Sequence, residues 1–333
     1  MGALRTTPEK LQALLDDAVV RGEEHACQLA VYLDGELFCD LAAGAADTAT
    51  YFPLFSAGKG PLITAVLRLV ERGVLELDAP VARYWPEFAA NGKERITLRD
   101  VLTHRAGLHI LPPATFAEQA DWRHMCALLV SRRPVGVPGT RTRYHSITFA
   151  WLAGEPAARA AGRDIRGLIR DEALTPAGID DFGYGVAPGD EARTLPVYHA
   201  PDAADEWLVR FIGDSDIRRA CIPSANAFGT ARALAKHYMA VLDGLLSPDM
   251  LASALTPPER GADDPVRGWE RFGLGYILWD GGAFGHGGAL GAEGLAVPER
   301  RLALGFATDT LRPEGHPVRD RISAELGIAP RHW

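Results

Sequence analysis

The sequence has little that would bind metals, membranes or nucleic acids. Its ten histidines form no HExxH motif, and its four cysteines form no CxxC pair. No apolar run approaches the roughly 20 residues of a transmembrane helix, and residues 1–24 lack the apolar core of a signal peptide. The net charge of −8 disfavours binding to nucleic-acid phosphates. We therefore expect no metal, no other cofactor, no nucleic-acid or membrane partner, a cytoplasmic location and buried free thiols.

Apolar periodicity places strands near both ends of the chain and helices between them. A helix is predicted from Thr7 to Gly22, followed by a hairpin whose Asp34-Gly35 turn joins strands 28–33 and 36–41. The other predicted strands are 272–279, 283–287, 294–297 and 301–308. Helices are predicted after Ser56 as far as Gly73, at 99–103, 149–161 and 231–242, and from Val318 to Gly327.

This arrangement predicts an α/β (α+β) fold with one antiparallel sheet built from both termini and flanked by helices. A mostly helical domain is inserted into it. We expect residues 1–80 and 220–333 to form the α/β domain and residues 81–219 the helical one, with the active site between them.

A serine and a lysine lie at the start of the helix that follows residue 55. In Ser56-Ala57-Gly58-Lys59 the two side chains are three residues apart, so on a helix they share one face. A serine hydroxyl needs a base to become a nucleophile, and burial beside other cations would lower the pKa of the lysine amine enough for that role. Alone, this SxxK motif is equally consistent with a capping serine and a solvated lysine.

Two further segments add chemical groups. Tyr144, in Tyr144-His145-Ser146, could relay a proton if neighbouring cations lowered its pKa, although a core tyrosine is the commoner outcome. Gly285-His286-Gly287-Gly288-Ala289 lies in a predicted strand, where glycines favour a close approach to the backbone or a bulge.

These segments, in this order, resemble the serine β-lactamase and penicillin-recognising superfamily. The resemblance is strongest to the class C-like branch, which includes the family VIII carboxylesterases. It extends over nearly the whole chain. The segments that carry it, besides the three motifs above, are Ile96–Leu108 (ITLRDVLTHRAGL), Pro223–Arg232 (PSANAFGTAR), Phe272–Tyr276 (FGLGY) and Phe284–Gly288 (FGHGG).

The resemblance implies a catalytic role for each motif. Ser56 would be the acylated nucleophile, Lys59 its proton partner and Tyr144 a co-base. The backbone N–H groups of Ser56 and Ala289 would form the oxyanion hole. The implied reaction is acyl transfer through an acyl-enzyme, with release to water or to another acceptor.

Two departures from the family pattern bear on the substrate. Ser146 stands where β-lactamases usually have asparagine, and His286 replaces the usual lysine of the third motif, so a permanent cation for a substrate carboxylate is missing. Specificity is expected from loops near 108–116, 207–226 and 279–283. The predicted substrate-binding residues are Ser146, Asn226, His286, Gly287 and Gly288.

The sequence therefore predicts a serine hydrolase, foremost a carboxylesterase that acts on small-molecule esters or acyl donors. An acyltransferase in small-molecule metabolism, a β-lactamase or D-Ala-D-Ala-type peptidase with weak activity, and a non-catalytic binding protein on the same scaffold stay open as alternatives. The acyl group, the leaving group and the oligomeric state are not indicated by the sequence.

Overall fold

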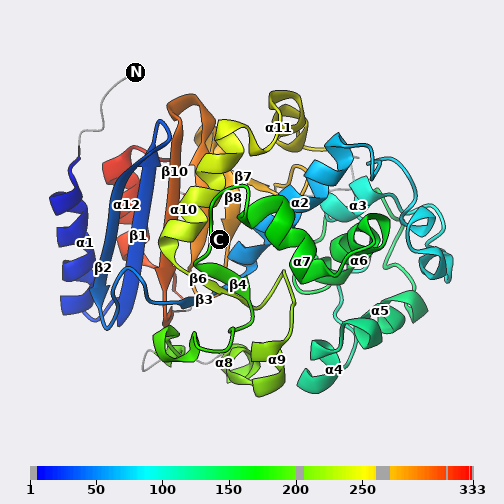
Figure 1. Ribbon diagram of the computed structural model, residues 1–333, viewed down its shortest axis with the longest axis horizontal. Coiled ribbons are helices and arrows are strands. Elements are labelled where there is room, and N and C mark those ends of the chain that lie inside the picture. The colour runs from blue at the N-terminus through cyan, green and yellow to red at the C-terminus, as the bar shows by residue number, and fades with distance from the viewer. Residues whose placement is uncertain (1–5, 200–205, 260–270, 313, 330, 332–333) are drawn as a thin grey trace.

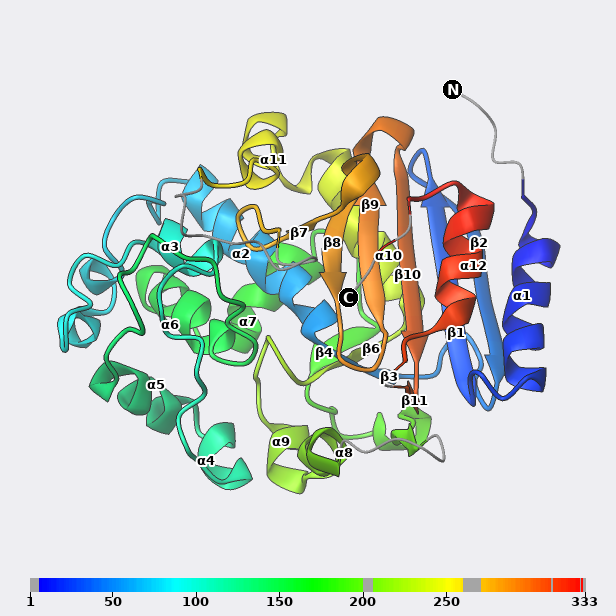
Figure 2. The same ribbon diagram turned by 180° about the vertical axis from the view of Figure 1, so that it is seen from behind.

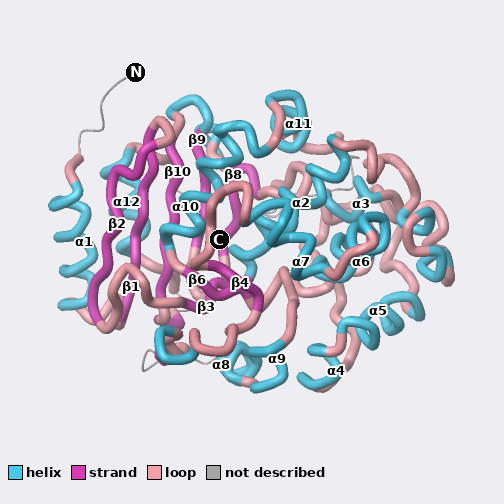
Figure 3. Tube along the Cα trace, viewed as in Figure 1, coloured by secondary structure: helices cyan, strands magenta, loops and turns pink. Residues whose placement is uncertain are grey.

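The computed structural model describes residues 6–199, 206–259, 271–312, 314–329 and 331. A six-stranded antiparallel sheet occupies one side of the molecule, and the helices of the middle of the chain occupy the other (Figures 1 and 3). In spatial order its strands are β2 (Glu36–Gly44), β1 (Ala26–Leu33), β10 (Leu302–Thr308), β9 (Glu293–Val297), β8 (Phe284–Gly287) and β7 (Ile277–Leu278). Strand β1 pairs directly with β10, with Ala30 opposite Gly305. Residues from both ends thus build one sheet, and the predicted fold class is confirmed.

Helices cover both faces of this sheet. Helices α1 (Pro8–Val20) and α12 (Pro317–Leu326) pack on one face, and α10 (Ala231–Ala240) packs on the other (Figures 1 and 2). Thr7 caps α1 with its side chain and Gly327 ends α12 in the left-handed conformation, as the sequence predicts. An apolar core fills the space on each face.

The helical region lies beyond the β7 edge of the sheet. Its helices are α3 (Leu98–Leu102), α4 (Phe116–Ala120), α5 (Trp122–Ser131), α6 (Phe149–Ala161) and α7 (Ile165–Ile169), and the chain then continues through α8 (Glu206–Gly213), α9 (Ser215–Arg219) and, after α10, α11 (Pro248–Ala254). Helix α2 (Lys59–Glu71) packs against α6 and α7 on this side and also contacts α10 and β8. None of the helices in the described ranges is both long and apolar enough to cross a membrane. The division at residues 80 and 220 stays a prediction.

Two smaller sheets lie outside the main one. One has the order β3 (Phe52–Phe55), β6 (Ala227–Gly229), β4 (Phe182–Tyr184), and the other pairs β5 (Tyr198–His199) with β11 (Thr310–Leu311). The pairing of β4 with β6 joins the end of the predicted helical insert to the segment that leads to α10. Because β3 runs directly into Ser56, this small sheet fixes where that serine lies.

Two expectations need correction. The predicted strand at 272–279 is reduced to β7, because Gly273 N–H bonds to the carbonyl of Tyr276 in a tight turn that contains Gly275 at φ +90°. All four cysteines are free, but Cys221 is partly exposed, whereas the other three are buried as expected.

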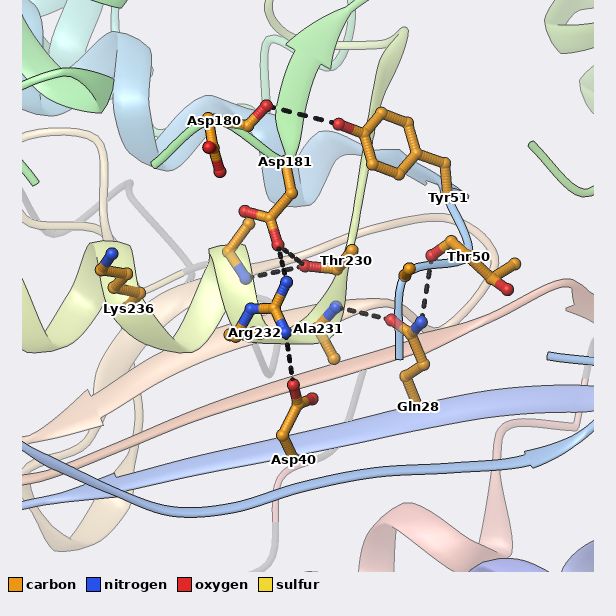
Figure 4. Close-up of polar contacts among 12 residues, drawn as sticks. Gln28, Asp40, Thr50, Tyr51, Asp180, Asp181, Thr230, Ala231, Arg232 and Lys236 are labelled. Atoms are coloured by element: carbon orange, nitrogen blue, oxygen red, sulfur yellow. Dashed lines mark hydrogen bonds and ion pairs between the residues drawn. The ribbon is translucent and has the colours of Figure 1, made fainter. Parts of the chain in front are cut away.

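A partly buried polar network ties α10 to the strands (Figure 4). Arg232 donates to Asp40 on β2 and to Asp181 just before β4, both at 2.7 Å. Gln28 on β1 accepts from the N–H of Ala231 at 2.9 Å and donates to the carbonyls of Asp47 and Thr50. Gln28 therefore joins the start of α10 to the loop that leads into β3.

Replacement of Gln28 by methionine tests this connection. Methionine matches the length of glutamine but leaves the Ala231 N–H and two loop carbonyls without their buried partner, so we expect a loss of about 2–4 kcal/mol in the free energy of unfolding. Denaturant unfolding measures it. Gln12→Met, at a partly exposed glutamine, is the matched control and should cost less than about 1 kcal/mol. An equally small effect at Gln28 would show that the network does not hold the loop.

Candidate active site

Ser56 follows β3 on a strained turn. Phe55, the last residue of β3, has φ +47° although it is a bulky buried side chain, and such a conformation costs about 1–3 kcal/mol. A 3₁₀ turn (Ser56–Gly58) follows and leads into α2. A Cβ at Gly58 would lie 2.3 Å from Ala227 Cβ on β6. The turn can therefore pack against β6 only because residue 58 is glycine.

Lys59 joins the three polar groups of the site. Its Nζ lies 2.9 Å from Ser56 Oγ, 2.9 Å from Tyr144 OH and 2.9 Å from the carbonyl oxygen of Ser224. Ser56 Oγ also donates to that carbonyl, at 3.1 Å. The structure thus brings together the three residues predicted as catalytic and adds a backbone acceptor that the sequence analysis missed.

Burial sets the protonation of this cluster. Lys59 is fully buried, and burial holds the pKa of its amine well below the usual range. The expected effect of burial on Lys59 is confirmed, whereas the lowered pKa comes from loss of solvation and not from the neighbouring cations that were also expected. For Tyr144 the expected lowering of the pKa by cations is wrong: burial raises the pKa of its phenol, against a smaller opposite effect of the Ser56 hydroxyl. Burial therefore favours the neutral amine of Lys59 and the protonated phenol of Tyr144.

His104 holds the segment that carries Tyr144. Its carbonyl accepts from the N–H of Arg143 at 2.9 Å and its Nδ1 accepts from the N–H of His145 at 3.1 Å. The ring meets the Tyr144 ring edge-on at 5.2 Å. His104 is fully buried at φ +59°, and burial keeps its pKa well below 6.5. The neutral ring, with Nδ1 as acceptor, fixes the residues on both sides of Tyr144.

The third motif reaches the site at the end of β8. A Cβ at Gly288 would lie 2.2 Å from the carbonyl oxygen of Leu54, so the chain after β8 crosses the end of β3 at close range. Gly288 N–H donates to the carbonyl of Ala292 in a tight turn, and Ala289 is exposed. Gly287 is buried within β8. The predicted oxyanion residue Ala289 therefore lies next to the turn that carries Ser56.

His286 is neutral and buried. Its Nδ1 donates to the carbonyl of Gly287 at 2.7 Å, and its ring lies 5.9 Å from that of Tyr144. Burial, and then the nearby Lys59, hold the pKa of His286 well below 6.5. No hydrogen-bond partner for Nε2 is found among the described residues. This side chain therefore offers a substrate no positive charge.

The other predicted substrate-binding residues differ in their surroundings. Ser146 is exposed two residues after Tyr144. Asn226 is fully buried: its Oδ1 accepts from the Ile222 N–H, and its Nδ2 donates to the carbonyls of Ile217 and Ala220. The Asn226 amide is thus used to shape the loop that presents the Ser224 carbonyl. Within the described ranges, no group of three or more His, Cys, Asp or Glu side chains is placed to hold a metal ion.

The site thus combines a serine hydroxyl, a buried lysine whose pKa is lowered and a tyrosine whose pKa is raised. These groups meet where an antiparallel sheet joins a helical region, and they define an acyl-transfer enzyme of the serine–lysine class. Comparison with known proteins agrees. A model of the Beta-lactamase family matches residues 11–327. Esterase/beta-lactamase LipL of Mycobacterium tuberculosis is 33% identical and is aligned over 85% of this chain and 76% of its own length.

Two further relatives share most of their length with this chain. Esterase EstB of Burkholderia gladioli is 28% identical over 80% of this chain and 78% of EstB. The crystal structure of a family VIII carboxylesterase superposes with a TM-score of 0.87 at 27% identity and covers 98% of both chains. The chain belongs to the beta-lactamase family, and the predicted enzyme class, a serine hydrolase, is confirmed.

Proposed function

We propose that this protein is a carboxylesterase that hydrolyses small-molecule esters through an acyl-enzyme on Ser56. The observation that carries the proposal is the 2.9 Å contact between Ser56 Oγ and the neutral Lys59 amine. The esterase names of LipL, EstB and the family VIII structure support it. A cytosolic location and a small-molecule ester as the partner remain part of the proposal.

Acylation begins with the serine proton. The neutral Lys59 amine takes the proton from Ser56 Oγ as the oxygen attacks the ester carbonyl carbon. The carbonyl oxygen becomes an oxyanion, which the N–H groups of Ser56 and Ala289 stabilise. One such donor is typically worth about 10²–10³ in rate.

Tyr144 is assigned the second proton transfer. The protonated phenol donates to the departing alkoxide and is reprotonated by Lys59 across their 2.9 Å contact. The leaving alcohol departs and Ser56 carries the acyl group. Water then releases the acid by the same steps in reverse, which returns the proton to Ser56. The raised pKa of Tyr144 suits a proton donor.

The neutral His286 favours esters over β-lactams, whose carboxylate would find no cation there. The test compares hydrolysis of p-nitrophenyl butyrate with that of nitrocefin. We expect kcat/KM for the ester to exceed that for nitrocefin by about 10²-fold or more, the scale of one lost charged contact. Preference for nitrocefin would overturn the esterase proposal in favour of a β-lactamase.

A further prediction concerns His104 as a positioning residue. His104→Phe keeps a buried ring but loses the acceptor for the His145 N–H, so kcat should fall by up to about 10²-fold with little change in KM. His104→Asn restores an acceptor and tolerates positive φ, so it should recover most of kcat. Equal kcat for wild type and His104→Phe at matched folded fraction would show that His104 does not position Tyr144.

A further inference from the structure

A cationic segment lies on the surface between α5 and α6. Residues 122–154 contain five arginines and no aspartate or glutamate, in a chain whose net charge is −8. Four of the arginines, Arg132, Arg133, Arg141 and Arg143, lie in the loop between the two helices. The charge of this loop is therefore opposite to that of the protein as a whole.

The loop forms one wall of a cavity. Its backbone runs beside residues 105–109, to which it is joined by hydrogen bonds from Val135 N–H to the Gly107 carbonyl and from Gly139 N–H to the Arg105 carbonyl, at 2.7 and 2.9 Å. Between the two segments lies a cavity of about 560 Å³, a size typical of small-molecule sites. Side chains that line it include Arg105, His109, Val135, Val137, Arg141 and Arg143.

The described residues that line this cavity include three arginines and no carboxylate. The Arg105 guanidinium contacts Thr142 Oγ1 and the carbonyls of Gly139 and Glu259. Neither Arg141 nor Arg143 forms an ion pair with any described residue, whereas arginines elsewhere commonly do. Guanidinium groups bind phosphates and carboxylates through paired hydrogen bonds.

Part of the lining of the cavity is apolar and exposed. Val135 and Val137 line it and are 54% and 71% exposed, although both are hydrophobic. An anion that carried a short alkyl chain would cover these valines while its charged group met the arginines.

We infer that this cavity, the arginine pocket, binds an amphiphilic anion, namely a phosphate or carboxylate attached to a short alkyl chain. Its ligand is a small molecule, because the cavity between the two loop segments has a volume of about 560 Å³ and the protein as a whole is acidic. The pocket is distinct from the Ser56 site: Arg143 lines the pocket, whereas the hydroxyl of the next residue, Tyr144, faces Lys59. The inference does not depend on the esterase proposal.

Isothermal titration calorimetry on the Ser56→Ala variant of the 333-residue chain tests the inference without turnover. The probes are hexyl phosphate, hexanoate and inorganic phosphate at low ionic strength. We expect hexyl phosphate to bind at least about tenfold more tightly than inorganic phosphate, because its methylene groups are buried against the valines. If hexanoate binds as tightly as hexyl phosphate, the pocket accepts a carboxylate as well as a phosphate. This result also supports the inference.

Variants of the lining residues locate the site. Arg141→Ala should weaken both hexyl phosphate and inorganic phosphate at least about fivefold. Val137→Ser should weaken only hexyl phosphate. Arg21→Ala, at an exposed arginine on the end of α1, is the matched control and should change neither affinity.

Three results would overturn the inference. The first is that neither hexyl phosphate nor hexanoate binds saturably. The second is that Arg141→Ala binds the probes with unchanged affinity. The third is that the protein binds anionic phospholipid vesicles but none of the soluble probes. The last result would mean that the loop meets a lipid surface and that the cavity is not a ligand site.

Discussion

Replacement of Ser56 by alanine is expected to abolish acyl-enzyme formation and to lower kcat for p-nitrophenyl butyrate by about 10⁴-fold or more. The reason is that the Ser56 hydroxyl is the oxygen that lies 2.9 Å from the Lys59 amine. Steady-state kinetics with carefully purified protein measures the loss. Binding of the ester should persist, because the variant removes one oxygen and keeps the backbone N–H groups of the proposed oxyanion hole.

The control is another serine of the same chain. Ser131 lies at the exposed end of α5, and its hydroxyl donates to the carbonyl of Leu128 at 2.8 Å. Ser131→Ala should therefore retain wild-type turnover. If Ser56→Ala and Ser131→Ala hydrolyse the ester equally, Ser56 is not the nucleophile.

Replacement of Lys59 by methionine is expected to cause the second large loss of activity. Methionine fills most of the buried space but has no base, so kcat should fall by about 10²–10⁴-fold, the usual contribution of a general base. Thermal unfolding should show an equally stable or more stable protein, because a buried amine is exchanged for an apolar chain. Loss of activity with retained stability would separate a chemical role from a structural one.

The pH profile identifies the base. Activity requires the neutral amine, so wild-type kcat/KM should rise with pH through the lowered pKa of Lys59 and then remain level. Because burial raises the pKa of Tyr144, activity that depended on a phenolate would rise only in strong alkali. Tyr144→Phe should lower kcat but keep the acidic limb of the profile, which is the rise of kcat/KM with pH. An acidic limb that persists in Lys59→Met and vanishes in Tyr144→Phe would assign the base to tyrosine.

The local parts of the fold could be predicted from the sequence. The Asp34-Gly35 turn fixes the first hairpin, and the three-residue spacing of Ser56 and Lys59 fixes their proximity on a helical turn. The strand predicted at 272–279 was mostly wrong, because a run of apolar residues does not reveal that Gly275 takes a positive φ and turns the chain.

Contacts in the site between residues far apart in the sequence were harder to predict. Tyr144 lies 85 residues from Lys59 in the sequence, and only the family resemblance placed them together. The Ser224 carbonyl cannot be recognised from the residue type, because every residue has a carbonyl. His104 and Ser224 both lie in segments that resemble the family, which is the signal that could have singled them out.

The direction of the Tyr144 pKa shift could not be obtained from the sequence. Whether a phenol becomes more or less acidic depends on the balance between burial and nearby charge. In the structure the neighbours of Tyr144 do not favour its ionised form: Lys59, His104 and His286 all have pKa values lowered by burial. The sequence showed only that basic residues were present. This difference changes the proposed role of Tyr144 from base to proton donor.

The most direct test of the central claim is the mass of the protein after brief exposure to p-nitrophenyl butyrate. Intact-mass spectrometry of a rapidly acidified sample should show one added butyryl group, and peptide mapping should place it on Ser56. Ser56→Ala should show no added mass. Butyrylation of another residue at wild-type rates, or turnover without any acyl-enzyme on Ser56 under single-turnover conditions, would contradict the account.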